Sequence, residues 1–380
     1  MTRNLPPENL RLVSTLRRDG SLEIRLEHAP LLPPGPGEVV VRIAAAPINP
    51  SDLMNFLGPA DAATARFEEH DGQPRMVAQL PPAEARALAG RCDMKLTSGL
   101  EGAGLVVAAG EGAAQLLERN VAFLTLASGT FAEYATVPAS ACVPLPEGVA
   151  PRAGAALFVN PLTALAIAET ARIEGYRGLV HTAAASNLGQ MLVKICVEDG
   201  LPLVNIVRRP EQAELLRRLG AVHVCDSSAS TFAQDLAQAL EATGAAVLFD
   251  ALGGGAMAHR VLAAMESVAA ARLPAYSPYG STEHKQVYVY GHLDRSPLEL
   301  RHDSYGMLWG VSGWVMPSIL ERVGAARAAA LQQRVVAGLS TTFASHFTQE
   351  ISLAQMLSPD AMKAYSRQAT GEKFLVNPTL

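Results

Sequence analysis

The residues with the clearest chemical potential form a short turn between two apolar segments. Leu179 and Val180 open an apolar run, and the small residues 183–187 follow it. From Leu188 the apolar positions recur at helical spacing, so this stretch predicts a strand, a tight turn and a helix. The backbone N–H groups and the dipole at such a helix start suit a phosphate group. Only Gly189 remains of the G-x-G-x-x-G pattern of dinucleotide sites, so the turn alone also fits an ordinary strand–helix crossover.

Two adjacent arginines follow the next predicted strand. Arg208 and Arg209 stand about twenty residues after the turn, where an NAD site carries a carboxylate for the ribose 2′-hydroxyl and an NADP site carries an arginine for the 2′-phosphate. A guanidinium group matches a phosphate in geometry and charge, and no carboxylate precedes Glu211. We therefore interpret the motif as an NADP(H) site. The alternative is a pair of solvated arginines at the start of a surface helix.

The size and charge of the chain exclude several classes of protein. Its 380 residues are enough for two domains, and its net charge of −5 with a pI near 6.0 argues against nucleic acid as a partner. No uncharged apolar run reaches about eighteen residues, and the N-terminus lacks the apolar core of a signal peptide, so we expect no membrane span and a cytoplasmic location. A disulfide framework or cysteine-rich zinc lobe is disfavoured because the four cysteines are far apart: Cys92, Cys142, Cys196 and Cys225.

The order of strands and helices indicates two architectures in one chain. From residue 178 onward, strands and helices alternate, which predicts a parallel sheet with helices on both faces and ligands at the carboxyl ends of its strands. One of these ends holds Leu252 and Gly253, and the glycines 253–255 predict a flexible turn. The N-terminal part is instead rich in short strands, at 11–15, 22–26, 38–43, 104–108, 121–126 and 129–137.

Several segments are harder to place. Residues 58–98 are polar and low in β-branched residues, which predicts a loop with one or two short helices over a cleft or at an oligomer contact, or a surface insertion. Residues 317–336 predict one helix. Late strands at 342–347 and 374–376 need a sheet to join, and the N-terminal domain is the plausible one.

Six motifs in this order resemble a known family, the medium-chain dehydrogenase/reductase superfamily, in its zinc-independent quinone oxidoreductase-like branch. The resemblance covers nearly the whole chain except 58–98 and parts of 270–330. Each motif is weak alone, but their succession along one chain is specific. They are Pro36-Gly37-Glu38-Val39-Val40-Val41, Ile48-Asn49-Pro50-Ser51-Asp52, Gly99-Leu100-Glu101-Gly102-Ala103-Gly104, Gly129-Thr130-Phe131-Ala132-Glu133-Tyr134, Asn160-Pro161-Leu162-Thr163-Ala164-Leu165 and Thr370-Gly371-Glu372-Lys373-Phe374.

The resemblance implies an α/β protein of two domains. A GroES-like, β-rich catalytic domain would comprise residues 1–155 and 340–380, with 58–98 as an insertion. A Rossmann domain, a doubly wound parallel sheet that binds NADP(H), would comprise residues 156–339.

The resemblance also implies roles for individual residues. Asn49, Asn160 and Thr163 would lie near the nicotinamide and its ribose, and Arg208 and Arg209 would meet the 2′-phosphate. Ser186 and Asn187 replace the more usual glycines, and their side chains would hydrogen-bond the phosphate instead. The expected pyrophosphate contacts are Ala185, Ser186, Asn187, Leu188 and Gly189. Leu252 and Gly253, at another strand end, are further expected cofactor contacts.

Hydride transfer without a metal is the implied chemistry. Zinc-dependent members of the family carry a cysteine at the place of Asn49 and a histidine at the place of Leu100, so both ligands are absent here. A rival hypothesis is a metal enzyme built on histidine and aspartate side chains, whose spacing fits no standard zinc pattern. These side chains are His284, His292, His302 and Asp303.

The expected reaction is NADPH-dependent reduction of a quinone or an α,β-unsaturated carbonyl, a small electrophilic substrate. Such acceptors need mainly proximity, orientation and exclusion of water. Asn49 and Tyr134 are the candidate catalytic residues, and Tyr279 and Tyr305 are further candidate proton donors. One alternative is a 2-enoyl thioester reductase, but relatives of that kind carry a tyrosine that residues 55–60 lack. Another is a non-catalytic NADPH-binding or sensor protein. The family further implies a homodimer, through an edge strand near 287–290.

Overall fold

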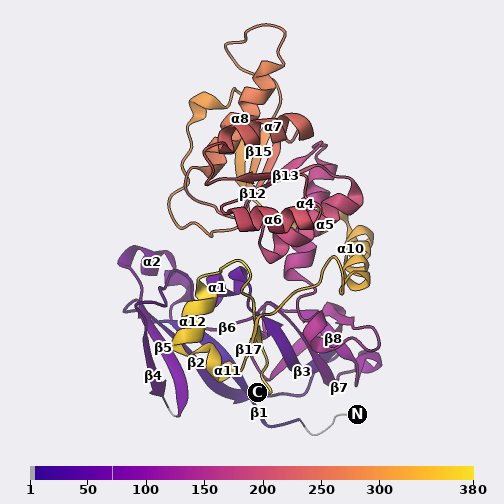
Figure 1. Cartoon of the computed structure of the whole chain (residues 1–380). Helices are drawn as coiled ribbons and strands as arrows, with labels where there is room; N and C mark the ends of the chain where they lie inside the picture. The colour runs from indigo at the N-terminus through magenta and orange to yellow at the C-terminus, as the bar shows by residue number, and fades with distance from the viewer. Residues whose placement is uncertain (1–4, 71) are drawn as a thin grey trace. The chain divides into compact units, whose positions relative to one another are not determined.

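The computed structural model describes residues 5–70 and 72–380 (Figure 1). The chain divides into two compact units. The first comprises Met1–Val159 and Val336–Leu380, and the second comprises Asn160–Val335. The sequence-based boundaries, 155/156 and 339/340, lie within a few residues of these divisions.

The first unit is rich in strands, as the N-terminal pattern predicts. Its strands are β1 (Glu8–Leu16), β2 (Ser21–Pro30), β3 (Glu38–Pro47), β4 (Arg66–His70), β5 (Gln73–Gln79), β6 (Lys95–Thr97), β7 (Glu101–Ala109), β8 (Asn120–Leu124), β9 (Tyr134–Pro138), β10 (Cys142–Pro144), β17 (Gln349–Ile351) and β18 (Phe374–Val376). Its helices are α1 (Pro50–Phe56), α2 (Pro82–Ala87), α3 (Pro151–Gly154), α11 (Leu353–Met356) and α12 (Pro359–Ser366).

Strand β3 is central to this unit because it pairs with three others, β7, β9 and β18. Its residues Val39, Val40 and Val41 have no exposed surface, which explains the continuous apolar run in the sequence. One sheet has the order β10-β8-β7-β3-β18-β17, and the other has the order β4-β5-β2-β1-β6. The C-terminal strand β18 therefore joins the N-terminal sheet, as predicted, and Figure 1 shows the yellow β17 close to the indigo β3.

Two sequence-based predictions for this unit are wrong. Residues 58–98 are not mainly loop, because they supply β4, β5 and β6 to the sheet of β1 and β2. The alternation of the buried Met76, Ala78 and Leu80 reveals β5, but β4 is an exposed edge strand without an apolar face. Residues 342–347 form turns and irregular chain, and the strand follows them at β17.

The second unit alternates strands and helices. Its strands are β11 (Leu179–His181), β12 (Leu203–Val207), β13 (His223–Asp226), β14 (Val247–Asp250), β15 (Lys285–Val289) and β16 (Trp309–Gly313). Its helices are α5 (Asn187–Asp199), α6 (Pro210–Arg218), α7 (Phe232–Thr243), α8 (Met257–Ala271) and α9 (Met316–Val323), with α4 (Val159–Ile173) and α10 (Ala325–Ala337) at the two junctions with the first unit.

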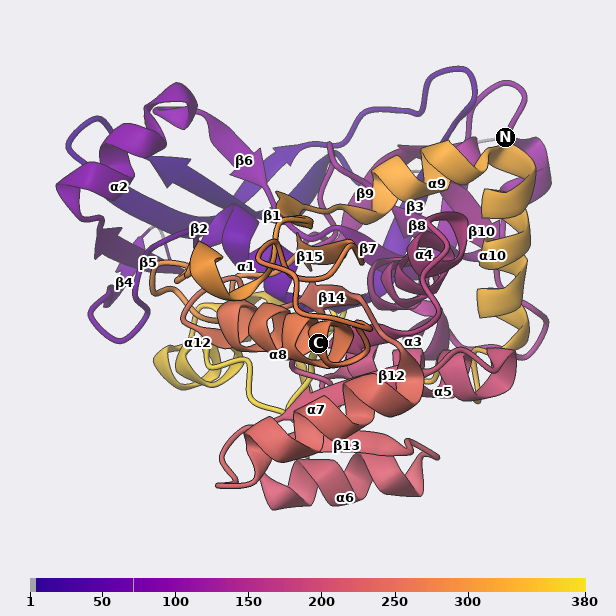
Figure 2. The ribbon, with the colours of Figure 1, turned by 90° about the horizontal axis from the view of Figure 1, so that it is seen from above.

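All strands of this unit run parallel, in the order β13-β12-β11-β14-β15-β16. The chain leaves β11 toward β12 on one side and returns to β14 on the other. Such a reversal of strand order opens a crevice at the carboxyl ends of the strands, where ligands bind in this architecture. Figure 2 shows β13 between α6 and α7, both of which pack on it. The predicted doubly wound parallel sheet is confirmed.

Three further predictions for the second unit need correction. Strand β15 pairs with β14 and β16 on its two sides, so the segment 287–290 is not an edge. The helix expected over 317–336 is two helices, α9 and α10, because Gly324 adopts φ 81° between them. The glycines 253–255 are required by packing and not by flexibility, because a Cβ on Gly253 would overlap the carbonyl oxygen of Gly291.

The helical stretch Pro151–Ile173 is long and apolar enough to cross a membrane by length and composition alone. However, 78% of its most apolar window is buried inside the protein. Core packing therefore accounts for the apolar composition of this stretch.

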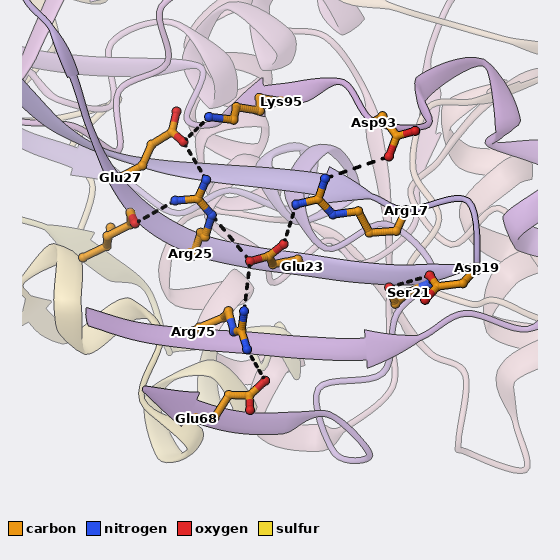
Figure 3. A network of polar contacts seen from close by, with 11 residues as sticks. Arg17, Asp19, Ser21, Glu23, Arg25, Glu27, Glu68, Arg75, Asp93 and Lys95 are labelled. Atoms are coloured by element: carbon orange, nitrogen blue, oxygen red, sulfur yellow. Dashed lines mark hydrogen bonds and ion pairs between the residues drawn. The ribbon is translucent and has the colours of Figure 1, made fainter. Parts of the chain in front are cut away.

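An ionic network crosses the β1–β2 part of the first unit (Figure 3). Glu27 is nearly buried and accepts from Lys95 at 2.6 Å, from Arg25 at 2.8 Å and from Arg11 at 3.0 Å. Burial opposes ionisation of Glu27, but its pKa is nevertheless lowered because Lys95 and Arg11 donate hydrogen bonds to it. The neighbouring Glu23 contacts a second set of cations, Arg17, Arg25 and Arg75.

We predict that Glu27→Gln lowers the free energy of unfolding by about 1–3 kcal/mol at neutral pH. Because the folded-state pKa of Glu27 is lowered from 4.5, its contribution is complete above that pH and is lost as the pH falls through the folded-state value. Urea unfolding of both proteins at neutral and acidic pH measures the difference. Glu69→Gln, at an exposed site on β4, is the matched control with little expected change. A deficit that stayed constant down to acidic pH would contradict the assignment.

Candidate functional site

The predicted phosphate turn lies at the carboxyl end of β11, in the centre of the parallel sheet. Ser186 is the N-cap of α5, and its Oγ accepts a hydrogen bond of 3.1 Å from the backbone N–H of Gly189. Only the hydroxyl proton of Ser186 is therefore left for a phosphate oxygen. Ala185 and Leu188 are buried, so their contribution to a ligand is limited to backbone groups. Gly200, with φ 64°, ends the helix in the left-handed conformation that glycine favours.

Position 189 requires glycine for a steric reason. A Cβ at this position would overlap the carbonyl group of Ala184, so α5 can approach the turn this closely only with glycine. Ala183 adopts φ 49°, a left-handed conformation that favours glycine, although it is alanine. The turn thus has the backbone course of a glycine-rich loop with one glycine. Its position at a helix N-terminus fits a pyrophosphate.

A buried aspartate that the sequence analysis left without a role holds the neighbouring strand end. Asp250 has no exposed surface and accepts from Thr182 Oγ1 at 2.7 Å and from the backbone N–H groups of Leu252 and Gly253 at 3.0 and 3.1 Å. Thr182 in turn accepts from the N–H of Ala251 at 2.8 Å. The expected contact residues Leu252 and Gly253 are therefore fixed against the end of β11, beside the predicted turn.

The arginine pair follows β12, the neighbour of β11 in the sheet. Arg208 and Arg209 are both exposed, and neither guanidinium pairs with a carboxylate of the described residues. The backbone N–H of Arg208 donates to Gln212 Oε1 at 3.1 Å, and Arg209 is the N-cap of α6. The structure thus brings the turn and the arginines to adjacent strand ends, with the guanidinium groups available to a phosphate.

In the first unit, Asn49 belongs to a buried polar cluster. Its Nδ2 donates to Glu101 Oε1 at 2.9 Å, and its backbone N–H donates to Asp52 Oδ2 at 2.8 Å. Glu101 also accepts from the N–H groups of Phe158 and Val159 at 2.8 and 2.9 Å. Asn49, Asp52 and Glu101 are each at most 1% exposed. In the sequence, Asp52 and Glu101 stand out only as members of motifs. Their contact with Asn49 arises only when the chain folds, so the sequence analysis did not find it.

Electrostatics distinguish this cluster from an ordinary surface ion pair. Burial raises the pKa of Asp52 to about 7, and the nearby Glu101 adds to the effect. Burial also raises the pKa of Glu101. The positive charge of Lys373 and the three N–H groups that donate to Glu101 act in the opposite direction and lower this pKa. Burial lowers the pKa of Lys373 to about 8, although both carboxylates attract its positive charge.

The remaining candidate residues, two nicotinamide contacts and three tyrosines, differ in their surroundings. Asn160 and Thr163 lie one turn apart at the start of α4, so they share one face of that helix. Tyr134 begins β9, with its backbone N–H bonded to Asn9 at 3.0 Å. The hydroxyl of Tyr305 lies 2.6 Å from His259 Nδ1 and accepts from the N–H of Arg301, so it is not a free proton donor. Tyr279 is 70% exposed, in the loop between α8 and β15.

A metal site would need several ligands close together. Within residues 5–70 and 72–380, no three histidine, cysteine, aspartate or glutamate side chains gather in that way. Of the rival candidates, His284 Nδ1 lies 3.5 Å from the hydroxyl of Tyr176, and His302 begins a short 3-10 helix with Asp303.

We predict that Gly189→Ala disturbs the turn, because the new Cβ meets the Ala184 carbonyl. The free energy of unfolding should fall by about 1–3 kcal/mol, and NADPH should bind more weakly. Thermal unfolding and fluorescence titration measure the two effects. Gly90→Ala is the control, since a Cβ there meets no atom within 4 Å. Unchanged stability and NADPH affinity in Gly189→Ala would rule out the proposed role of this close approach.

Comparisons with known proteins agree with both units. A model of the alcohol dehydrogenase GroES-like domain matches residues 35–147, and a model described as NAD(P)H-binding matches residues 183–295. A crystal structure described as a candidate NADPH:quinone reductase from Mesorhizobium loti is 25% identical, with a TM-score of 0.74, and the match covers 99% of this chain and all of that one. The expected cofactor, NADP(H), agrees with the second match.

Curated relatives add two comparisons. The synaptic vesicle membrane protein VAT-1 homolog of Rattus norvegicus is 28% identical over 61% of this chain and 51% of its own length. The mitochondrial enoyl-[acyl-carrier-protein] reductase of Caenorhabditis elegans is 26% identical over 50% of this chain and 49% of its own length. The chain thus spans about half the length of the curated relatives it matches.

The order of the two matched domains, the fold of each unit and these similarities point to one family. They support the resemblance to the medium-chain dehydrogenase/reductase superfamily, in its quinone reductase-like branch, and the expected cofactor NADP(H).

Proposed function

We propose that the protein uses NADPH to reduce a quinone or an α,β-unsaturated carbonyl without a metal ion. The observation that carries the cofactor preference is the exposed pair Arg208 and Arg209 at the end of β12. It lies beside a turn whose helix N-terminus suits a pyrophosphate. The similarity to a quinone reductase-like structure over the whole chain supports the acceptor class.

The side chains at the two positions of the expected zinc ligands do not favour a metal ion. Leu100 has no donor atom, and the amide nitrogen of Asn49 donates to Glu101. This pair does not fit a zinc site, whose ligands are thiolate, imidazole or carboxylate. The polarising role of a metal is therefore left to other groups of the chain.

The mechanism follows from what each unit can hold. NADPH supplies the hydride when bound. In the second unit, Ser186, Asn187 and the backbone of the turn before Gly189 would hold the pyrophosphate, with Arg208 and Arg209 on the 2′-phosphate. Asn49, Asn160 and Thr163 would orient the nicotinamide and its ribose. For a quinone, positioning and exclusion of water supply most of the remaining catalysis.

A second candidate is a 2-enoyl thioester reductase, favoured by the similarity to the enoyl reductase of C. elegans. Residues 55–60 contain no tyrosine at the place expected for such enzymes. Turnover of a crotonyl thioester faster than of any quinone or enone would favour this candidate. Binding of NADPH without oxidation by either class would favour a non-catalytic protein. The expected cytoplasmic location stays a prediction.

For NADPH selectivity, we predict that Arg208→Ala/Arg209→Ala removes the preference over NADH. Loss of charge-assisted phosphate contacts should cost on the order of 1.5–3 kcal/mol of NADPH binding and leave NADH binding unchanged. Fluorescence titration with both nucleotides measures this difference. Arg217→Ala/Arg218→Ala, in the last turn of α6, is the matched control for the loss of two charges. Equal binding of NADPH and NADH to the wild type would contradict the NADP site.

We also propose that the protein forms a homodimer, through β16. Strand β16 is an edge strand of the parallel sheet, whereas the segment 287–290, in β15, lies inside the sheet. It carries no charged residue, and apolar side chains flank it, with Met307 69% and Val315 58% exposed. An uncharged edge strand with apolar flanks is a ready template for pairing with a second copy.

We predict that Met307→Lys/Val315→Lys converts a dimer into a monomer, because four like charges would meet across a two-fold contact. Light scattering after gel filtration should show a fall from twice 40.0 kDa to 40.0 kDa. Val222→Lys, 82% exposed just before β13 at the other side of the sheet, is the control and should stay dimeric. A dimer that survives the double substitution would place the contact elsewhere.

A further inference from the structure

Lys373 presents a buried ammonium group without a hydrogen-bond partner among the described residues. The stem of the side chain is partly exposed, but its Nζ is withdrawn from solvent. The backbone fixes its position: the N–H of Lys373 donates to Thr348 Oγ1 at 3.1 Å, and its carbonyl accepts from the N–H of Thr348 at 2.9 Å. The N–H of Ile48 donates to the carbonyl of the next residue, Phe374, at 3.1 Å. Lys373 is thereby held close to the segment of Asn49.

The charged groups that act on Lys373 come from two elements, Asp52 from α1 and Glu101 from β7. They supply counter-charge, but neither carboxylate forms a hydrogen bond with Nζ, and both accept N–H groups of the chain instead. Asp52 accepts from Asn49 and from Leu100 at 2.9 Å, and Glu101 accepts from three donors. The Phe347 ring, whose centroid is 5.5 Å from Nζ, offers no oxygen.

An ammonium group withdrawn from water with unmet N–H donors is costly to a fold. The cluster keeps it charged through two carboxylates, yet leaves its donors open. Structural ion pairs are arranged differently, as in the second unit, where buried Lys285 bonds directly to Glu266 and to Ser281 Oγ. The open donors of Lys373 therefore point to a ligand oxygen that carries or develops negative charge.

We propose that Lys373 is a catalytic residue that binds the carbonyl oxygen of the electron acceptor and donates a proton to it. This inference rests on the proposed reaction and adds to it the group that takes the place of a metal. It assigns the proton to an ammonium group of the first unit and not to Tyr134, Tyr279 or Tyr305.

The acceptor in this step is an enone. The C–H bond at nicotinamide C4 breaks, and the hydride with its electron pair forms a C–H bond at the β-carbon of the acceptor. The acceptor is reduced, NADPH is oxidised to NADP⁺, and the displaced electron pair reaches the carbonyl oxygen. An N–H bond of Lys373 breaks and an O–H bond forms, which gives an enol that tautomerises to the saturated ketone. The neutral amine of Lys373 recovers a proton from solvent.

The proposal has a pH signature. The pKa of Lys373 is about 8, so the protonated form is present at neutral pH and is lost as the pH rises through that value. Asp52, with a pKa of about 7, and Glu101 are the other titrating groups that act on it. Turnover should therefore fall on the alkaline side in the wild type. Lys373→Arg keeps the positive charge at higher pH, so its oxyanion binding should not show this alkaline loss.

The test compares Lys373→Met, Lys373→Arg and wild type, with Lys363→Met as control for the loss of one exposed positive charge. The first readout is binding of 4-nitrophenolate, a stable oxyanion, to the NADP⁺ complex, followed by its absorbance. We expect binding about tenfold to hundredfold weaker in Lys373→Met, restored largely by Lys373→Arg and unchanged in Lys363→Met. The affinity for NADPH should stay within about twofold in every variant.

The second readout is kcat for reduction of 2-cyclohexen-1-one, which should fall about tenfold or more in Lys373→Met. Equal phenolate binding in all proteins, or no binding to the wild type, would overturn the inference. Loss of NADPH affinity in Lys373→Met would overturn it too, because the cation would then serve a nucleotide phosphate. A wild type that binds phenolate through Lys373 but reduces no acceptor would contradict the proposed reaction while keeping the oxyanion site. Thermal unfolding of Lys373→Arg separates a folding defect from these outcomes.

Discussion

The first unit depends on one buried carboxylate, that of Glu101. It accepts hydrogen bonds from the cap residue of α1, Asn49, and from the backbone N–H groups of Phe158 and Val159 at the start of α4. Burying a carboxylate is costly, and here three donors and a helix N-terminus offset that cost. The same contacts fix where β7 begins, how α1 is oriented and where the chain leaves the β-rich sheet. A shorter side chain at this position would leave these donors unmet.

This constraint also sets the chemistry available to the cluster. Zinc-dependent relatives resemble this chain in keeping a glutamate here, but Asn49 and Leu100 stand where their zinc-binding cysteine and histidine would be. Two buried carboxylates favour a positive charge beside them. Lys373 supplies it from the other end of the chain. A single ammonium group polarises an oxygen less strongly than a metal ion, but it can also give up a proton. That difference suits quinones and enones, which need little activation.

The sequence predicted those features that have a local pattern. The alternation of strands and helices after residue 178, and the strand, turn and helix around residues 179–188, follow from the periodicity of the apolar residues. Other features depend on what a segment packs against. Strand β4 has no apolar face that would predict it from the sequence. Strand β15 lies inside the sheet because β16 pairs with its outer side. The cluster of Asn49, Glu101 and Lys373 joins segments more than fifty residues apart, and no local pattern encodes that distance.

The phosphate turn shows how tertiary contacts can replace a sequence motif. Ala183 holds a left-handed conformation that costs an alanine roughly 1–2 kcal/mol, where glycine would pay nothing. Neighbouring contacts impose it: Thr182 is bonded to buried Asp250, and the N–H of Ala184 donates to the carbonyl of Ile206 at 3.2 Å. Glycine is indispensable only at Gly189, where the helix meets the turn. What a dinucleotide site requires is this backbone course, and a search for glycines alone underestimates how many sequences can adopt it.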